Sequence, residues 1–332
     1  MSTPLQVAED IRRVRSEAEE QDRMAEEVRA GLESRPLPML PSKYFYDERG
    51  GALFDEITRL PEYYLTRTEE ALLPAVAAEV VRHVRPRNLV ELGSGVGGKV
   101  RMLLDAMDAA GTLQSCTLLD ISETAIASSL ARLRAERPGL RTSGVVGDFL
   151  TDLRAVGPGE SRLIAFLGST IGNIDPREVP AFFRSAAAIL APGDAVLLGV
   201  DLVKDRARLE AAYNDARGVT AEFNRNILRV MNDRLGADFE PEAFEHVAFY
   251  DTERSWIEMR LRARDAVDVQ VPGAGASLSL PAGGEIRTEI SCKYTRESLE
   301  TALRGTGLML DEWRTDPGSL FALALLRRLG RA

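Results

Sequence analysis

The chain has 332 residues and a formal net charge of −9 at pH 7. Its length exceeds that of a usual single hydrophobic core, so we expect two domains or one domain with a large insertion. The acidic balance disfavours a nucleic-acid partner, no apolar run approaches the length of a membrane span, and the first residues lack the apolar region of a signal peptide. We therefore expect a cytoplasmic protein with no nucleic-acid or membrane partner.

Cysteines and histidines are scarce, with two of each. Cys116 and Cys292 both lie inside apparent strands, and two such residues make no disulfide framework. We interpret them as small buried side chains in a reducing compartment. His83 and His246 each lack a cysteine or second histidine at metal-ligand spacing, so we expect packing or surface roles and no metal site.

Helical and strand patterns follow one another along most of the chain. A charged helical pattern at residues 9–32 predicts one amphipathic helix. Further helices are expected at residues 66–84, with Thr66 or Thr68 as the N-cap, and at 99–110, 122–136 and 179–190. Continuous apolar strands are expected at residues 87–92, 115–120, 142–149, 161–168 and 194–201. Such strands separated by helices indicate an α/β fold, a doubly wound, Rossmann-like parallel sheet covered on both faces.

The alternation stops near residue 202 and resumes near residue 294. Between them lie long helical stretches at 205–235 and strand patterns at 246–251, 255–271 and 284–294. A helix at 296–307 and strands at 308–316 and 320–328 would then complete the sheet. We therefore expect a core domain of residues 67–201 and 294–332, and a second, α+β domain of residues 15–66 and 202–293.

A glycine-rich turn, VELGSGVGGK at residues 90–99, lies between a strand and a helix. Gly93, Gly95 and Gly98 satisfy the G-x-G-x-x-G pattern of dinucleotide sites, which keeps an NAD-dependent oxidoreductase as one interpretation. However, Glu91 precedes the first glycine and Lys99 begins the helix. A carboxylate before the turn suits a cationic group, such as the amino group of a methionine moiety.

Carboxylates also end the next two strands. Asp120 can accept hydrogen bonds from both ribose hydroxyls, and Asp148 with the ring of Phe149 can hold an adenine. Together with the E-x-G-x-G turn, these residues resemble the class I S-adenosylmethionine-dependent methyltransferases. This favours S-adenosylmethionine over NAD.

Other stretches resemble one family within that class, the histidine-specific Nα-methyltransferases of ergothioneine biosynthesis. They are KYFYDERGGALFDEITRLPEYYLTRTE (43–69), AFLGSTIGNI (165–174), GVDLVKD (199–205), AAYNDARGVTAEFNRNIL (211–228) and RTEISCKY (287–294). The resemblance implies an enzyme that transfers three methyl groups from S-adenosylmethionine to the α-amino group of L-histidine. The product is Nα,Nα,Nα-trimethylhistidine (hercynine), made in the first step of that pathway. It also implies a methyltransferase domain joined to a substrate domain.

The resemblance further implies roles for single residues. The positions matching cofactor-binding residues are Tyr46, Gly93, Lys99, Asp120, Asp148, Phe149 and Gly168. Those matching substrate-binding residues are Tyr63, Asn173, Tyr213, Met259, Glu289, Ile290 and Ser291, with Tyr63, Asn173 and Tyr213 as the catalytic set that holds the amino and carboxylate groups. We expect no metal, and a monomer.

The strand pattern at residues 285–294 gives two of these residues a common direction. Glu289 and Ser291 are two apart, so they lie on one face of a strand about 7 Å from each other. A carboxylate can accept from one imidazole nitrogen while a hydroxyl donates to the other. We hypothesise that this pair selects histidine. A methyltransferase of tryptophan or another aromatic amino acid is the alternative, and a non-catalytic S-adenosylmethionine-binding module is a third interpretation.

Overall fold

The computed structural model describes residues 10–93 and 98–330, which form two compact units. The core unit consists of residues 1–14, 65–203 and 293–332, and the second unit of residues 15–64 and 204–292. These boundaries lie within two residues of the predicted domain limits, apart from the N-terminal segment that the core unit adds. Ser94 to Gly97 of the glycine-rich turn, including Gly95, lie outside the described residues.

An eight-stranded sheet forms the core unit. Its strands are β1 (Ile11–Arg13), β2 (Asn88–Leu92), β3 (Ser115–Asp120), β4 (Arg141–Val146), β5 (Arg162–Phe166), β6 (Ala195–Asp201), β12 (Leu308–Thr315) and β13 (Phe321–Arg328). Their order is β1-β4-β3-β2-β5-β6-β13-β12. The first six pair in parallel, whereas β13 runs antiparallel to both neighbours. The chain reverses its direction of winding after β4, which places β5 beside β2, and open α/β sheets bind their ligands at the carboxyl ends of the strands at such a switch point.

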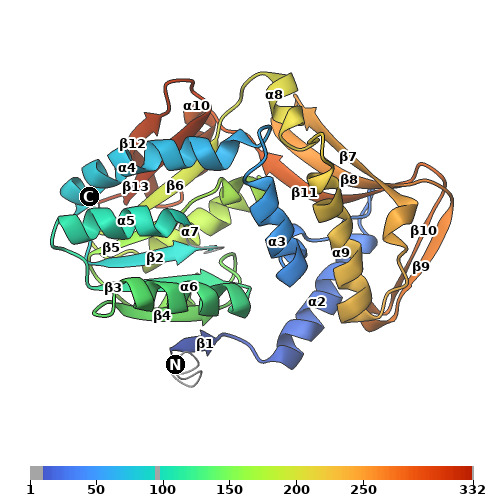
Figure 1. Ribbon diagram of the computed structural model, residues 1–332, viewed down its shortest axis with the longest axis horizontal. Coiled ribbons are helices and arrows are strands. Elements are labelled where there is room, and N and C mark those ends of the chain that lie inside the picture. The colour runs from blue at the N-terminus through green and yellow to red at the C-terminus, as the bar shows by residue number, and fades with distance from the viewer. Residues whose placement is uncertain (1–9, 94–97, 331–332) are drawn as a thin grey trace. The chain divides into compact units, whose positions relative to one another are not determined.

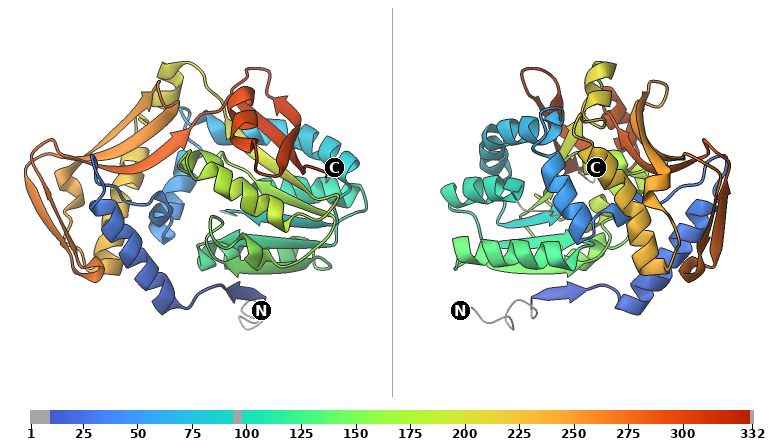
Figure 2. Two further views of the ribbon diagram at one scale, coloured as in Figure 1. Left: turned by 180° about the vertical axis from the view of Figure 1, so that it is seen from behind. Right: turned by 45° about the vertical axis from the view of Figure 1, so that its right-hand side comes forward.

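Helices cover both faces of this sheet, as the doubly wound prediction requires. They are α4 (Tyr64–Val84), α5 (Gly98–Ala109), α6 (Glu123–Glu136), α7 (Val179–Ile189) and α10 (Arg296–Leu303). Figure 1 shows α4, α5 and α6 on one face, and the reverse view in Figure 2 shows α7 and α10 on the other. Apolar residues of α4, α5 and α6 form one buried cluster with inward-facing residues of the strands. The predicted α/β fold is confirmed.

The single helix predicted at residues 9–32 is wrong in its first third. Residues Ile11–Arg13 form β1, which pairs in parallel with β4 from Gly144 to Val146. Helix α2 (Glu17–Leu32) begins only after Ser16, whose side chain accepts from the Glu19 amide while the Glu19 carboxylate accepts from the Ser16 amide. This capping box fixes the start of the helix and leaves the preceding segment free to extend along the sheet.

Helix α4 also begins earlier than predicted. Its first residue is Tyr64, so Thr66 and Thr68 lie inside the helix and neither is its N-cap.

The second unit combines helices with two antiparallel sheets. Its helices are α2, α3 (Glu48–Ile57), α8 (Arg206–Ala211) and α9 (Val219–Leu235), and its strands are β7 (Phe244–Asp251), β8 (Trp256–Ala263), β9 (Val267–Val271), β10 (Ala276–Leu280) and β11 (Glu285–Cys292). The strands form the sheet β11-β8-β7 and the hairpin β9-β10. The short 3₁₀ helices of this unit are η1 (Ser42–Phe45), η4 (Pro241–Ala243) and η5 (Pro272–Ala274), whereas η2 (Leu153–Val156) and η3 (Thr170–Asn173) belong to the core unit.

The helical stretch expected at residues 205–235 is two helices, α8 and α9. Gly218 separates them with φ 73°, and the Asp215 carboxylate accepts from the amides of Val219 and Thr220 at 2.9 and 2.8 Å. That carboxylate satisfies donors at the start of α9, which have no partner within the helix.

Both cysteines are free and buried, Cys116 on β3 and Cys292 on β11, as predicted. Among the described residues, no helix is long and apolar enough to cross a membrane.

Candidate functional site

The predicted cofactor residues of the core unit gather where its parallel strands end. Gly93 follows β2, Asp120 ends β3, Asp148 lies two residues after β4, and Gly168 lies two residues after β5. Parallel strands end at the same edge of a sheet, so these four residues share the carboxyl edge. Gly93 has φ 71°, a backbone conformation that glycine adopts without strain.

A buried carboxylate of α4 joins two of the predicted cofactor residues. Glu69 is completely buried, and its Oε2 accepts from Lys99 Nζ at 2.7 Å. The same carboxylate accepts from the Gly168 amide at 2.9 and 3.0 Å. Gly199 on β6 leaves room for it, since a Cβ there would overlap with Glu69 Oε1. Glu69 therefore fixes the Lys99 ammonium and the turn after β5 relative to each other.

Glu91, the carboxylate before the glycine turn, lies buried on β2. Burial raises its pKa to about 8, the neighbouring carboxylates of Asp120 and Glu69 act in the same direction, and Lys99 opposes them. Its Oε2 has no hydrogen-bond partner in the part of the chain that the structure describes. A buried carboxylate oxygen without a donor is costly, and a cationic ligand at this position would satisfy it. The amino group of S-adenosylmethionine fits that requirement.

The two predicted nucleoside-binding carboxylates are held by the chain turns beside them. Asp120 Oδ1 accepts from the Ser122 amide at 2.8 Å, and Asp148 Oδ1 accepts from the Leu150 amide at 2.9 Å. The ring of Phe149 packs against Phe166, with centroids 5.0 Å apart. These contacts fix one oxygen of each carboxylate and the plane of the ring. Carboxylates oriented in this way suit a ribose and an adenine.

Asn173 lies in the turn that follows β5. Gly168 and Ser169 both have positive φ, 76° and 57°, and Asn173 ends the short helix η3 (Thr170–Asn173). The Ser169 hydroxyl accepts from the Asp201 amide at 2.9 Å, which ties the turn to the end of β6. Left-handed backbone at a non-glycine residue is costly and is found most often at functional sites. Asn173 is half-buried on this constrained turn.

In the second unit, the predicted imidazole-recognising residues lie on one face of β11. Glu289 pairs with Met259 and Ser291 pairs with Ile257 on β8, and directly paired residues point to the same face of a sheet. Met259 therefore faces the same way as Glu289. The register shifts between Arg287 and Glu289, so β11 bulges at Thr288. Ile290 alternates to the other face, opposite Glu258, and could contact a ligand there only through its main chain.

The solvent-exposed face expected for a half-buried strand is absent at this end of β11. Glu289 is 8% exposed and Ser291 is 3% exposed. Polar groups buried to this degree require hydrogen-bond partners, which a wetted strand face would not.

Tyr213 contacts this face directly. Its hydroxyl donates to Ser291 Oγ at 2.8 Å, and its ring lies edge-on to that of Tyr63, with centroids 6.4 Å apart. Tyr63 in turn packs against Phe54. Two tyrosines, a serine and a glutamate thus come together within the second unit.

Tyr46, predicted to lie near the cofactor, belongs to the second unit. Its ring packs against Phe54 at 5.6 Å and Phe223 at 5.7 Å. Its role at the cofactor stays a prediction, as do the roles assigned to the other site residues.

Neither Glu69 nor the partners of His246 have a sequence pattern that assigns them a role. Glu69 is the last residue of the quoted stretch 43–69, so the resemblance included it without assigning it a role. His246 was expected to be a packing or surface residue, but it is hydrogen-bonded through both ring nitrogens to Asn224 and to the Tyr213 carbonyl. Pairing between residues so far apart in the chain leaves no local signal.

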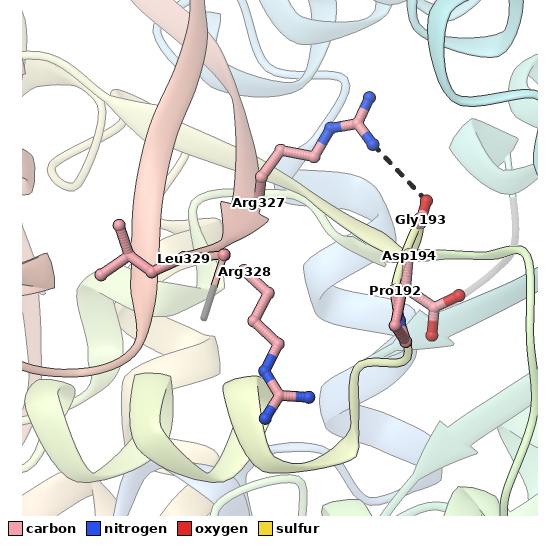
Figure 3. Close-up of a pocket in the computed structure, with 7 residues that line it drawn as sticks. Pro192, Gly193, Asp194, Arg327, Arg328 and Leu329 are labelled. Carbon is pink, nitrogen blue, oxygen red and sulfur yellow. Dashed lines mark hydrogen bonds between the residues drawn. The ribbon is translucent and has the colours of Figure 1, made fainter. Parts of the chain in front are cut away.

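Two other features of the core unit lie away from these residues. A surface depression is lined by Pro192, Gly193, Asp194, Arg327, Arg328, Leu329 and Gly330, at the amino end of β6, and Arg327 donates to the Gly193 carbonyl across it (Figure 3). No predicted site residue lines it. His83, at the end of α4, lies beside the acidic residues Asp311 and Glu312, an exposed group whose geometry suits a cation but which needs none.

The sheet order, with its final antiparallel strand, and the residues at its carboxyl edge define a class I S-adenosylmethionine-dependent methyltransferase fold. A family model described as "Histidine-specific methyltransferase, SAM-dependent" matches residues 24–328. The chain belongs to this family.

Named relatives agree with that assignment. Histidine N-alpha-methyltransferase of Mycolicibacterium smegmatis is 47% identical over 302 residues, which cover 91% of this chain and 94% of that protein. The protein of the same name from Mycobacterium tuberculosis is 44% identical, covering 90% and 93%. Ergothioneine biosynthesis protein 1 of Neurospora crassa is 31% identical, covering 96% of this chain and 36% of that larger protein.

Proposed function

We propose that this chain is an L-histidine Nα-methyltransferase that makes Nα,Nα,Nα-trimethylhistidine in the first step of ergothioneine biosynthesis. The observation that carries the proposal is the buried polar face of β11, where Glu289 and Ser291 lie beside Met259 and Tyr213 in a chain of the histidine-specific family. An imidazole is a small ring with one donor and one acceptor nitrogen. It fits a face that offers one carboxylate and one hydroxyl.

S-adenosylmethionine, when bound, supplies a methyl group on a positively charged sulfur. In the core unit, Lys99 suits the carboxylate of its methionine part and Glu91 suits the amino group. Asp120 suits the ribose hydroxyls, and Asp148 with Phe149 suits the adenine. At each transfer the neutral substrate amine forms a bond to the methyl carbon as the carbon–sulfur bond breaks, with the electron pair passing to sulfur. The ammonium formed by the first and second transfers loses a proton before the next one, whereas the third transfer leaves a quaternary ammonium with no proton to lose.

The chain's own contribution is to hold the amine as a neutral nucleophile in line with that methyl group. Asn173, Tyr63 and Tyr213 carry uncharged side chains that can donate or accept hydrogen bonds. A carboxylate paired with the amine would instead favour the ammonium form, which has no lone pair. Alignment of this kind contributes roughly 7–11 kcal/mol to lowering a barrier. No metal is needed for such a displacement.

Selection of histidine follows from the buried polar partners. Charge-assisted hydrogen bonds contribute roughly 1.5–3 kcal/mol each. A site that leaves buried polar groups unpaired rejects the wrong substrate by up to about 10⁴-fold. An indole offers only one donor and would leave the Ser291 side of the face without an acceptor. This argues for histidine over tryptophan.

The test is a competition among all twenty amino acids with S-adenosylmethionine, read by mass spectrometry. Trimethylated histidine as the main product is the expected result. Methylation of another amino acid in preference would contradict the assignment of the β11 face but not the cofactor. We also propose that the enzyme is cytoplasmic, since both cysteines are free thiols, and, as a separate proposal, that it is a monomer. Light scattering of the purified protein tests the oligomeric state.

A further inference from the structure

A chain of hydrogen bonds in the second unit connects His246 with the substrate-binding residues. It contains Asn224 on α9, His246 on β7 and Thr288 at the bulge of β11. Asn224 is completely buried and Thr288 is 1% exposed. None of these three was assigned a function from the sequence.

The orientation of the Asn224 amide is fixed by its partners. One side chain atom lies 3.0 Å from the main-chain oxygen of Arg260, which can only accept, so this atom is the nitrogen Nδ2. The oxygen Oδ1 then accepts from the Thr288 hydroxyl at 2.6 Å. The second hydrogen of Nδ2 points to His246 Nδ1 at 2.8 Å. Exchange of the nitrogen and the oxygen would place two acceptors against each other.

This orientation determines the state of the imidazole. His246 Nδ1 faces a donor and must present a lone pair, whereas Nε2 lies 2.8 Å from the Tyr213 carbonyl and must carry the hydrogen. An imidazolium would direct a second N–H against the Asn224 amide. The hydrogen bonds are therefore complete only with neutral His246.

The electrostatic surroundings act in the same direction. Burial lowers the pKa of His246 from its ordinary value of 6.5, and Arg225 on α9 lowers it further. The Tyr213 carbonyl opposes this shift, as do the carboxylates of Asp215 and Glu245.

At its two ends the chain of hydrogen bonds reaches residues predicted to bind the substrate. His246 holds the main chain of Tyr213, whose hydroxyl donates to Ser291. Thr288 directly precedes Glu289, and its hydroxyl also lies 3.2 Å from the Met259 carbonyl. We infer that His246, acting through Asn224 and Thr288, is a positioning residue that sets Tyr213 and the Glu289 end of β11 for recognition of the amino-acid substrate. This inference rests on the proposed function.

Removing the imidazole should weaken substrate binding without affecting the cofactor. His246→Leu removes the imidazole partner of one Asn224 N–H and of the Tyr213 carbonyl, so we expect the KM for histidine to rise roughly tenfold or more. The KM for S-adenosylmethionine should change less than about twofold, since its predicted ligands, apart from Tyr46, lie in the core unit. The matched control is His83→Gln, an exposed histidine of the core unit.

Two further variants separate positioning from folding. His246→Gln offers one donor and one acceptor at the end of its side chain and should restore most of the affinity for histidine. Thr288→Val keeps the side chain's shape but removes its hydroxyl, and should also raise the KM for histidine. This variant tests the inference if His246→Leu does not fold. The inference would be overturned if His246→Leu or Thr288→Val changed the KM for histidine and the KM for S-adenosylmethionine equally, or if neither variant changed the KM for histidine.

The neutral state gives an independent readout. Because the sequence has only two histidines, the His83→Gln protein contains one imidazole, and nitrogen NMR should show Nε2 protonated and Nδ1 bare. Acid should raise the KM for histidine in the wild type relative to His246→Gln as pH falls through the pKa of His246, which burial lowers from its ordinary value. Taking this ratio at each pH cancels the titration of the substrate. A hydrogen on Nδ1 at neutral pH would contradict the assignment.

Failure of the proposed function would look different. If the wild type prefers another amino acid, the same variants are measured with that substrate. The positioning inference is then tested only by the ratio of each variant's KM for that amino acid to the wild-type KM.

Discussion

The two units use opposite kinds of polar group at their predicted binding residues. In the core unit the groups are ionisable: Glu69 pairs with Lys99, and Glu91 is buried with a raised pKa that a cationic ligand would lower. In the second unit they are largely neutral: Tyr213, Ser291, Asn224 and an uncharged His246, beside the single carboxylate of Glu289. A ligand with fixed charges is matched by the first kind, whereas an amine that must stay neutral is matched by the second. Substitutions at the cofactor residues should therefore act mainly through charge, and substitutions at the substrate residues mainly through geometry.

The largest effect should come from Glu289, the carboxylate of the second unit that we predict to bind the imidazole of the substrate. Glu289→Ala should lower kcat/KM for histidine by about 10³- to 10⁴-fold, because the imidazole N–H would lose its charged partner. Combining it with Met259→Ala should relax selection towards tryptophan. Competition between the two amino acids measures this, with Glu253→Ala in the exposed β7–β8 turn as control. Full histidine preference in the double variant would contradict the assigned role.

The second largest effect should come from removing the buried charge of Glu69 in the core unit. Glu69→Gln breaks the pair with Lys99, and breaking a buried pair costs about 3–5 kcal/mol. We expect affinity for S-adenosylhomocysteine to fall roughly a hundredfold, less than the whole cost because part of it appears as lost stability. Affinity for 5′-methylthioadenosine, which lacks the amino-acid part, should change little. Calorimetry measures both.

The control is Glu79→Gln on the same helix, whose partner Arg314 is half exposed. A surface pair contributes about 0–1 kcal/mol, so neither affinity should change measurably. Equal losses for the two ligands in Glu69→Gln would indicate a general disturbance of the fold instead of a misplaced Lys99.

Proton release on ligand binding should reveal that Glu91 is protonated in the free protein. A cationic ligand lowers the pKa of this carboxyl from about 8, so binding below that pH releases a proton and affinity rises with pH by up to about tenfold per unit. Between about pH 6 and 7 the ligand's own amine stays protonated. Binding heats of S-adenosylhomocysteine in two buffers of different ionisation enthalpy measure the release. Glu91→Gln should abolish it, and an unchanged release in that variant would assign the proton to another group.

The smallest effect should come from the start of α2, which touches neither set of residues. Ser16→Ala removes the capping box and should cost about 1 kcal/mol of stability. The melting temperature should fall by about 2–4 °C while both KM values stay constant. Ser16→Asp should retain most of the stability. A change in either KM would show that the start of α2 is coupled to the predicted binding residues.

Sequence patterns were sufficient for the sheet of the core unit apart from β1. Residues 163–166 and 195–200 are continuous apolar runs, and that pattern indicates a buried parallel sheet when helices intervene. By contrast, Ile11–Arg13 is three residues in a charged segment, and only pairing with β4 makes it a strand. Tertiary contact of that kind has no local signature.

The candidate residues show the same limit. Glu289 and Ser291 share a face, as their spacing predicted, although the bulge at Thr288 was not foreseeable from alternation. Glu69 and Glu70 are adjacent glutamates on one helix, and only the fold shows that Glu69 is the buried one. The state of His246 depends on Asn224, 22 residues earlier in the chain.

The chain leaves the core unit and returns to it at neighbouring positions. Leu202 forms a bridge with Tyr294, whose amide donates to the Asp201 carbonyl at 2.8 Å and whose carbonyl accepts from the Val203 amide at 3.0 Å. Insertions whose ends lie together disturb their host little. Residues 204–292 can therefore change in length and sequence without disturbing the core sheet, as long as they keep their contacts with residues 15–64, such as that of Tyr213 with Tyr63. New amino-acid specificities can arise by changes within this second unit while the core unit stays as it is.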